Sequence, residues 1–185
     1  MAKAVFLDRD GTIIRDMVYL NDPQKIEVFQ ESYEAVRILN ENEYLVFLAT
    51  NQSGVARGLV DEKNLILINS IIIDDFKQKG AIISAAFYCP HPVDRGCPCR
   101  KPNPGMLLDG ADKFGVDLSK SWMIGDRMTD VVAGQKAGCQ SILLQNQTTP
   151  PIEYSFGEPP MICENLLSAS QFIVDKVHPR KKVVK

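Results

Sequence analysis

Short apolar runs alternate along this 185-residue chain with stretches in which apolar residues recur at helical spacing. The short runs predict strands at residues 4–7, 45–49, 82–88, 122–124 and 141–144. The other stretches, with their caps and glycine stops, predict helices at 32–42, 61–79, 103–115 and 168–177, and one that ends near residue 138. Because strands alternate with helices, we expect a parallel sheet covered on both faces, which is the doubly wound, Rossmann-like α/β fold.

Two carboxylates follow the first predicted strand, in the run Asp8-Arg9-Asp10-Gly11-Thr12. An Asp-Gly pair is common in turns, but a turn alone does not explain why Asp8 comes directly after four apolar residues. Residues i and i+2 of an extended segment share a side, so both carboxylates can face one site. A divalent cation would relieve their repulsion and hold a phosphate. The pair therefore predicts a cation site at the end of this strand.

Polar groups also follow the second and fourth predicted strands, where ligands bind in sheets of this kind. The hydroxyls and amides of Thr50-Asn51-Gln52-Ser53 suit hydrogen bonds to an oxyanion. Arg100 and Lys101 precede a predicted helix N-terminus, which itself favours anions. Asp126 follows the fourth strand, and Asp130 lies four residues further on.

A segment rich in cysteine follows the third predicted strand. Cys89, His91, Cys97 and Cys99 supply three thiolates and one imidazole, a complete tetrahedral set for structural zinc. Reduced cysteines are often buried in a core, but the prolines and charged residues of this stretch argue against a core strand. We expect Zn²⁺ with no open position, which folds a loop that leads directly to Arg100 and Lys101.

The composition indicates one globular domain over residues 1–178, with a basic tail at 179–185. A net charge of −2 argues against a broad surface for nucleic acid or membrane. No apolar run approaches the length of a membrane span, and we expect a cytoplasmic protein. Its five cysteines are then no disulfide framework, and Cys139 and Cys163 are expected to be ordinary packing residues. Without a long heptad pattern, the expected state is a monomer.

The ordered motifs from Asp8 to Asp130 resemble those of haloacid dehalogenase (HAD) phosphatases. The shared pattern is Asp-x-Asp-Gly-Thr, a threonine at the second strand, a downstream lysine and Gly-Asp-x-x-x-Asp. The resemblance implies that Asp8 attacks phosphorus and that Asp10 acts as general acid and then as general base. It further implies that Thr50 and Lys101 bind the phosphoryl oxygens. The implied Mg²⁺ ligands are Asp8, the backbone carbonyl of Asp10, and Asp126.

The cysteine loop narrows the resemblance to the subgroup of heptose 1,7-bisphosphate 7-phosphatases and histidinol-phosphatase domains. That resemblance implies substrate contacts from three regions, which are Asp16, Met17, Val18 and Tyr19; Thr50, Asn51, Gln52 and Ser53; and Arg100, Lys101 and Arg127. The gaps between motifs hold no separate cap domain, so we expect short loops at 16–23 and 89–101 to border the site.

Three functions fit these observations. The first is hydrolysis of the C7 phosphate of D-glycero-D-manno-heptose 1,7-bisphosphate, for which Arg100 and Arg127 would bind the second phosphate. The second is hydrolysis of histidinol phosphate, whose cationic groups could meet Asp16 or Asp22, or of another small sugar phosphate. The third is a non-catalytic zinc-loop module that binds phosphorylated ligands or a protein partner. Intact Asp8, Asp10, and Asp126 favour a Mg²⁺-dependent phosphatase over such a module.

Overall fold

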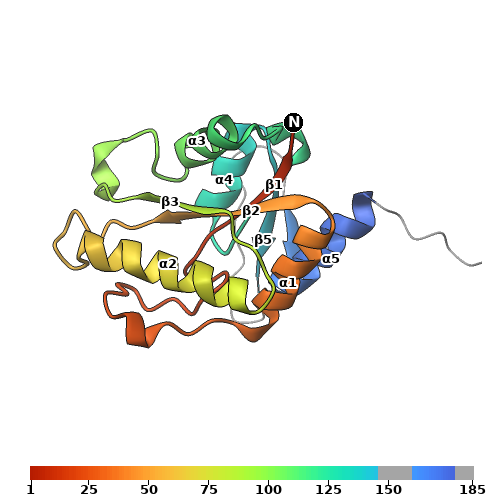
Figure 1. Ribbon diagram of the computed structural model, residues 1–185. Coiled ribbons are helices and arrows are strands. Elements are labelled where there is room, and N and C mark those ends of the chain that lie inside the picture. Colours follow the sequence, from red (N-terminus) through yellow and green to blue (C-terminus); the bar gives the residue numbers. More distant parts are fainter. Residues whose placement is uncertain (146–159, 178–185) are drawn as a thin grey trace, which may run out of the picture.

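In the computed structural model, which describes residues 1–145 and 160–177, a six-stranded parallel sheet forms the centre of the protein (Figure 1). The strand order is β3-β2-β1-β4-β5-β6, and every paired neighbour is parallel. The strands are β1 (Lys3–Leu7), β2 (Tyr44–Asn51), β3 (Ala85–Cys89), β4 (Trp122–Gly125), β5 (Gln140–Leu144) and β6 (Met161–Cys163). The expected doubly wound α/β fold is confirmed.

In the described part of the chain, five α-helices cover the two faces of this sheet (Figure 1). They are α1 (Gln30–Glu41), α2 (Glu62–Gln78), α3 (Gly105–Phe114), α4 (Met128–Ala137) and α5 (Leu166–Val177). The described residues also form three short 3₁₀ turns, η1 (Pro23–Lys25) before α1, η2 (Val93–Arg95) before α3 and η3 (Leu118–Lys120) before β4. Helices α1, α2 and α5 contribute to one hydrophobic core, and α3 contributes to the other.

Alternation along β1 divides its side chains between these two cores. Val5 and Leu7 belong to the core under α1, α2 and α5. Ala4 and Phe6 belong to the opposite core, where the Phe6 ring lies 5.3 Å from that of Phe47. All four side chains are fully buried, and burial of a large apolar side chain contributes roughly 1.5–3 kcal/mol. A strand that is apolar on both faces is therefore fixed in the middle of the sheet.

The strand order reverses beside β1, between β1 and β4. In open α/β sheets this switch point is where the loops that follow neighbouring strands diverge and leave room for a ligand. The backbone of Asp8 continues the ladder there, because its N–H donates to Ile124 O at 2.9 Å. The ends of β1 and β4 therefore place Asp8 beside the segment that carries Asp126.

Helix ends follow the sequence signals closely. Asp61 caps α2 by accepting a hydrogen bond from Lys63 N at 2.8 Å, and Gly115 and Gly138 end α3 and α4 in the left-handed conformation. The helix predicted at 103–115, with Asn103 as its cap, begins later than expected, because Pro104 occupies the N-cap position of α3. The Asn103 side chain instead donates to Cys97 O at 2.8 Å.

The third strand is shorter at its start than the expected 82–88. The side chain of Asn40 both donates to Ile82 O and accepts from Ile82 N, at 3.1 and 2.7 Å. These bonds occupy the backbone of Ile82 before β3 begins at Ala85. The edge strand β6 was not predicted, since its three residues carry no clear pattern. The expected basic tail at 179–185 lies outside the described residues.

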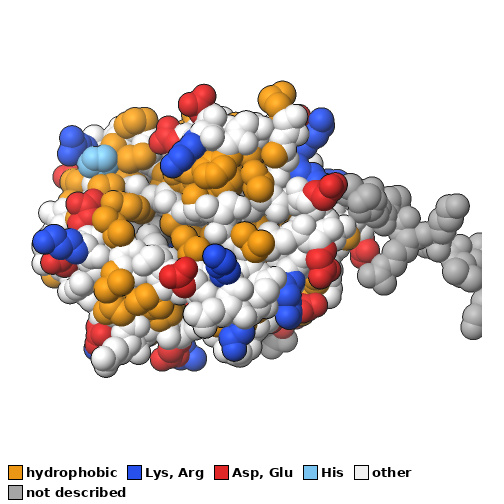
Figure 2. Space-filling model, viewed as in Figure 1, with side chains coloured by type: hydrophobic (Ala, Val, Ile, Leu, Met, Phe, Trp, Pro, Cys, Tyr) orange, Lys and Arg blue, Asp and Glu red, His pale blue; other side chains and the backbone are white. Residues whose placement is uncertain are grey.

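The chain between the strands that carry polar clusters contains only helices and loops. A turn and α1 separate β1 from β2, and α2 separates β2 from β3, so the described residues place no further sheet or helical unit between these strands. Within those residues, no helix has the length and apolar character needed to span a membrane. Charged side chains of both signs are interspersed on the face drawn in Figure 2, with hydrophobic patches between them.

Candidate active site

The ammonium group of Lys101 lies at the centre of the polar groups beyond the strand ends. Lys101 is 2% exposed, and its Nζ lies 2.7 Å from Asp8 Oδ1 and 2.6 Å from Asp130 Oδ1. It also donates to Ala49 O at 2.5 Å. Burial would lower the pKa of Lys101, but the carboxylates of Asp130 and Asp8 overcome it and hold the pKa above its ordinary value. The lysine is therefore a permanent cation between two acidic groups.

The carboxylate of Asp10 is held by the end of β2. Gln52 Nε2 donates to Asp10 Oδ2 at 2.8 Å and to Thr50 Oγ1 at 2.8 Å. Thr50 Oγ1 itself lies 3.4 Å from the same oxygen of Asp10. Burial raises the pKa of Asp10, while the neighbouring Arg9 guanidinium opposes the rise. A raised pKa suits a carboxyl group that must give up a proton to a leaving group.

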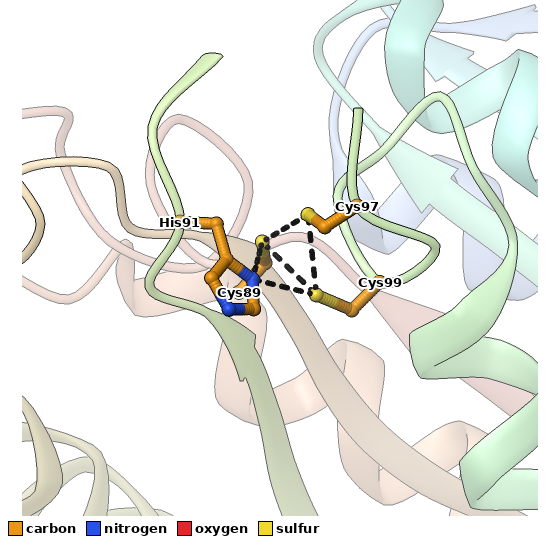
Figure 3. A group of neighbouring side chains, drawn as sticks. All are labelled: Cys89, His91, Cys97 and Cys99. Atoms are coloured by element: carbon orange, nitrogen blue, oxygen red, sulfur yellow. Dashed lines mark hydrogen bonds between the residues drawn. The ribbon is translucent and has the colours of Figure 1, made fainter. Parts of the chain in front are cut away.

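The four predicted zinc ligands meet in one cluster beyond β3, as Figure 3 shows. Cys99 Sγ lies 3.2 Å from Cys89 Sγ, 3.4 Å from Cys97 Sγ and 3.2 Å from His91 Nδ1. These separations far exceed a disulfide bond of about 2.05 Å, and they approach the edges of roughly 3.8 Å in a tetrahedral site with Zn–S near 2.3 Å. The donor set and its spacing fit a closed Zn²⁺ site.

Two asparagines join this loop to its surroundings. The Asn51 side chain donates to Lys101 O at 2.9 Å and accepts from Lys101 N at 3.0 Å, so the end of β2 holds both backbone groups of the lysine. Asn103 makes the bond to Cys97 O described above. The cysteine loop, β2 and the start of α3 therefore fix the point from which the Lys101 side chain enters the site.

A pocket of about 450 Å³ opens over these groups. It is lined by nearly all of the residues predicted to act in catalysis or to contact a substrate, which are Asp8, Asp10, Asp16, Val18, Tyr19, Thr50, Asn51, Gln52, Ser53, Arg100, Lys101 and Arg127. Met17 is not among the lining residues and packs against the hydrophobic core. Arg100 Nη1 is buried without a hydrogen-bond partner, which suits an anion in this pocket.

The mouth of the pocket is closed on one side by a link between two loops. Arg127 Nη2 donates to Asp16 Oδ2 at 2.8 Å, and Asp16 Oδ1 accepts from Val18 N at 2.8 Å. The Tyr19 hydroxyl accepts from Arg57 Nη1 at 2.6 Å. Asn21 Oδ1 accepts from Asp61 N at 2.9 Å and so ties the same loop to the start of α2.

Several known proteins that are similar to this chain are hydrolases. A profile described as HAD-hydrolase-like matches residues 98–169. A D-glycero-β-D-manno-heptose-1,7-bisphosphate 7-phosphatase of Bordetella bronchiseptica is 35% identical over 177 residues, which cover 94% of this chain and 99% of that protein. An enzyme of Campylobacter jejuni named for the α anomer is 38% identical over 145 residues, covering 78% of this chain and 83% of the relative.

This chain belongs to the heptose bisphosphate phosphatase family of the HAD superfamily. Its structure also resembles a solved one from that family. The crystal structure of a D,D-heptose 1,7-bisphosphate phosphatase from B. bronchiseptica, complexed with magnesium and phosphate, aligns with a TM-score of 0.82 and 34% identity, covering 94% of this chain and 99% of the other. The predicted family and fold are thereby confirmed.

The residues of this family member fit a magnesium ion. Asp8, Asp126 and Asp130 each offer a carboxylate oxygen, and these oxygens lie within 4.8 Å of one another. Asp126 Oδ1 is buried and has no hydrogen-bond partner among the described residues, and Arg127 Nε lies 4.0 Å from it. Burial, followed by the charges of Asp8 and Asp130, raises the pKa of Asp126 to about 7. A hard divalent cation would satisfy that oxygen and offset the repulsion among the three carboxylates.

Asp130 is better suited to hold Lys101 than to bind the metal. Its Oδ1 pairs with Lys101 Nζ, and its Oδ2 accepts from Arg127 N at 3.0 Å as part of the capping box of α4. Both oxygens are therefore engaged. No role for Asp130 was predicted from the sequence, although its place four residues after Asp126 and near the start of a helix was a usable signal. Arg9, whose contacts are described below, was also missed.

Gly11 brings the backbone against the carboxylate of Asp126. Its φ is +83°, and an added Cβ would overlap Asp126 Oδ2 and lie 2.8 Å from Asp126 Cγ. We expect Gly11→Ala to displace that carboxylate and to weaken Mg²⁺ binding about tenfold or more, measured by titration calorimetry.

Gly58→Ala is the matched control for this experiment. Gly58 has a similar φ of +67°, but no atom lies within 4 Å of its added Cβ. It should show the backbone strain of about 1–2 kcal/mol alone, with unchanged Mg²⁺ affinity. Equal affinities in the two variants would contradict the placement of Asp126 at the metal.

Proposed function

We propose that this protein is a Mg²⁺-dependent phosphatase that removes the C7 phosphate of D-glycero-D-manno-heptose 1,7-bisphosphate through an aspartyl-phosphate on Asp8. The observation that carries the proposal is its similarity to the Bordetella enzyme of that name over 99% of that enzyme's length. The paired carboxylates and buried lysine of the pocket supply the chemistry that such a reaction needs.

Each carboxylate beside β1 has its own step in this proposal. Asp8 attacks the C7 phosphorus, and an Asp8–phosphorus bond forms as the bond from phosphorus to the sugar oxygen breaks. The protonated Asp10 gives its proton to that sugar oxygen. Asp10 then takes a proton from water as the water attacks phosphorus and releases Asp8. The products are inorganic phosphate and the heptose 1-phosphate.

The charges around Asp8 make this attack on an anion feasible. Lys101 and Thr50 would bind phosphoryl oxygens, and Mg²⁺ would be held by Asp8, Asp126 and the backbone carbonyl of Asp10. The metal would neutralise charge on the phosphoryl group and on Asp8. Lys101 already pairs with Asp8 at 2.7 Å, so the cation stands beside the nucleophile before any substrate arrives.

The second phosphate of the substrate would meet the remaining cations of the pocket. Arg100 has a buried Nη1 without a hydrogen-bond partner, and Arg127 lies across the mouth on Asp16. The carboxylates that a cationic substrate would use are engaged, since Asp16 pairs with Arg127 and Asp22 caps η1 through Gln24 N. The Arg127–Asp16 pair engages one charge of each sign, so Arg100 Nη1, buried and without a partner among the described residues, is the group that favours a bisphosphate over histidinol phosphate.

A substrate panel tests the proposed specificity. We expect kcat/KM for heptose 1,7-bisphosphate to exceed that for histidinol phosphate and for simple sugar phosphates by roughly 30- to 150-fold. That factor corresponds to the 2–3 kcal/mol typical of a hydrogen bond to a charged group. The panel includes both anomers, because relatives named for each are similar to this chain. Faster hydrolysis of histidinol phosphate would overturn the assignment.

Removal of the nucleophile tests the mechanism separately. Asp8→Asn should lower phosphate release in the presence of Mg²⁺ by about 10³-fold or more, because an amide does not form the phosphoenzyme. Asp109→Asn makes the same chemical change at an exposed position of α3 and should keep full activity. Comparable phosphate release from the two variants would rule out Asp8 as the nucleophile.

We further propose that Zn²⁺ occupies the cluster of Cys89, His91, Cys97 and Cys99 and holds the loop that precedes Lys101. Cys97→Ser should lower the zinc content, measured by mass spectrometry. It should also lower phosphatase activity about 10- to 100-fold, because small displacements of a catalytic cation are costly. Circular dichroism should show that the sheet and helices remain.

Cys139→Ser provides the control for that variant. Cys139 is buried in the core under α3 and belongs to no ligand cluster, so its substitution should leave the zinc content unchanged. Full phosphatase activity after verified removal of zinc would contradict the proposed coupling between the loop and the site.

A further inference from the structure

Arg9 is a fully buried arginine that lies between the two carboxylates of the site in sequence. A buried guanidinium is costly unless its donors find partners. Arg9 has two such partners among the described residues. Its Nε and Nη2 donate to Asp10, and its Nη1 donates to Asn69 Oδ1 at 2.9 Å. The arginine therefore joins the proposed general acid to helix α2.

The contact between Arg9 and Asp10 involves both carboxylate oxygens. Arg9 Nε donates to Oδ2 at 3.1 Å, and Nη2 donates to Oδ1 at 3.1 Å. A bidentate pair of hydrogen bonds of this kind fixes the plane of the carboxylate as well as its position. Gln52 Nε2 approaches Oδ2 from the end of β2 at 2.8 Å. The carboxylate is thus held from two elements, and its rotation is restricted.

Asn69 supplies the third bond from an unusual position. It is 5% exposed in the interior of α2, on the face that carries the buried residues Leu65, Ile68 and Ile72. Asparagine is a poor residue for a helix interior and costly to bury without a hydrogen bond. Its side-chain oxygen accepts from Arg9. This hydrogen bond offsets the cost of burying Asn69 on an otherwise apolar face of α2.

We propose that Arg9 and Asn69 form a positioning pair that orients Asp10 for proton transfer. The inference rests on the role proposed above for Asp10. The two cations of the site then have separate tasks. Lys101 pairs with Asp8 and Asp130, whereas Arg9 pairs with Asp10 and is closed off from the pocket by its burial. Arg9 itself does not touch substrate.

The dependence of the rate on the leaving group separates positioning from a general structural role. A sugar oxygen is strongly basic and needs a proton as it leaves, whereas p-nitrophenolate leaves with little help. A misplaced Asp10 should therefore slow phosphorylation of Asp8 by heptose 1,7-bisphosphate but spare phosphorylation by p-nitrophenyl phosphate. It should also slow the later attack of water, which needs Asp10 as a base with either substrate.

Arg9→Lys keeps the positive charge and loses the bidentate hydrogen bonds to Asp10. We expect kcat for heptose 1,7-bisphosphate to fall about 10- to 100-fold, which is part of the 10²- to 10⁴-fold typical of a positioned acid or base, while KM changes less than about threefold. With p-nitrophenyl phosphate, the initial burst of nitrophenol should stay within about threefold of wild type. Steady-state turnover should fall, so the ratio of burst rate to turnover rises.

Asn69→Ala tests the same inference without altering the motif. It should shift the burst-to-turnover ratio in the same direction by a smaller factor, since the bond to Asp10 remains. Ile68→Val is the matched control, because Ile68 is a fully buried neighbour on α2. This control should lower thermal stability and leave the ratio unchanged.

Asp10→Asn distinguishes failure of the inference from failure of the proposed function. If Asp10→Asn raises the burst-to-turnover ratio while folded Arg9→Lys and Asn69→Ala keep the wild-type ratio, the positioning pair is refuted and the role of Asp10 stands. Proportional losses of burst and turnover in both variants would also refute it. If Asp10→Asn leaves the ratio unchanged, the role of Asp10 and the inference both fall.

Discussion

The buried ammonium group of Lys101 pairs with two carboxylates that lie beyond the ends of different strands. Asp8 follows β1, and Asp130 lies in the first turn of α4 after β4. Without the lysine, these carboxylates and the adjacent Asp126 would repel one another in a site with little water, and removal of one partner from a buried pair commonly costs 3–5 kcal/mol. The arrangement of the whole pocket therefore depends on the position of the Lys101 ammonium group.

The need to position this charge would explain why the proposed Zn²⁺ site lies beside the catalytic pocket. The segment before Lys101 contains prolines, glycine and charged residues, and it has no apolar face with which to fold. Four convergent ligands supply that order locally. The bonds from Asn51 to the backbone of Lys101 then align the loop with β2. The Cys/His cluster and the phosphatase pocket are therefore connected through the backbone, and the two candidate ligand groups share no residue.

With only α1, α2 and short connections between β1 and β3 in the described residues, the proposed function would leave substrate selection to short loops. The loop from Asp16 to Tyr19 reaches Arg127 across the mouth and is anchored to α2 through Asn21. Charged groups at this rim are partly exposed, so each bond contributes little to stability and can exchange for a bond to substrate. The buried groups fix the chemistry, while the rim remains free to determine which phosphate ester enters.

The sequence by itself determined the fold class, the order of most elements and the chemical type of the site. Apolar runs of two-sided burial specify strands of a covered parallel sheet, and polar residues at strand ends specify the ligand edge. The clustering of Cys89, His91, Cys97 and Cys99 was predictable because their spacing along the chain is local. These features can be predicted from the sequence because each depends on residues that are neighbours along the chain.

Only the tertiary structure showed which groups pair with which. Asp130 and Lys101 are separated by 29 positions, and Arg9 and Asn69 by 60, so no local pattern links them. Asn103 likewise resembles a helix cap until Cys97 O is placed beside its side chain. Buried polar groups take partners according to the packing of distant elements, and the folded sheet decides that packing.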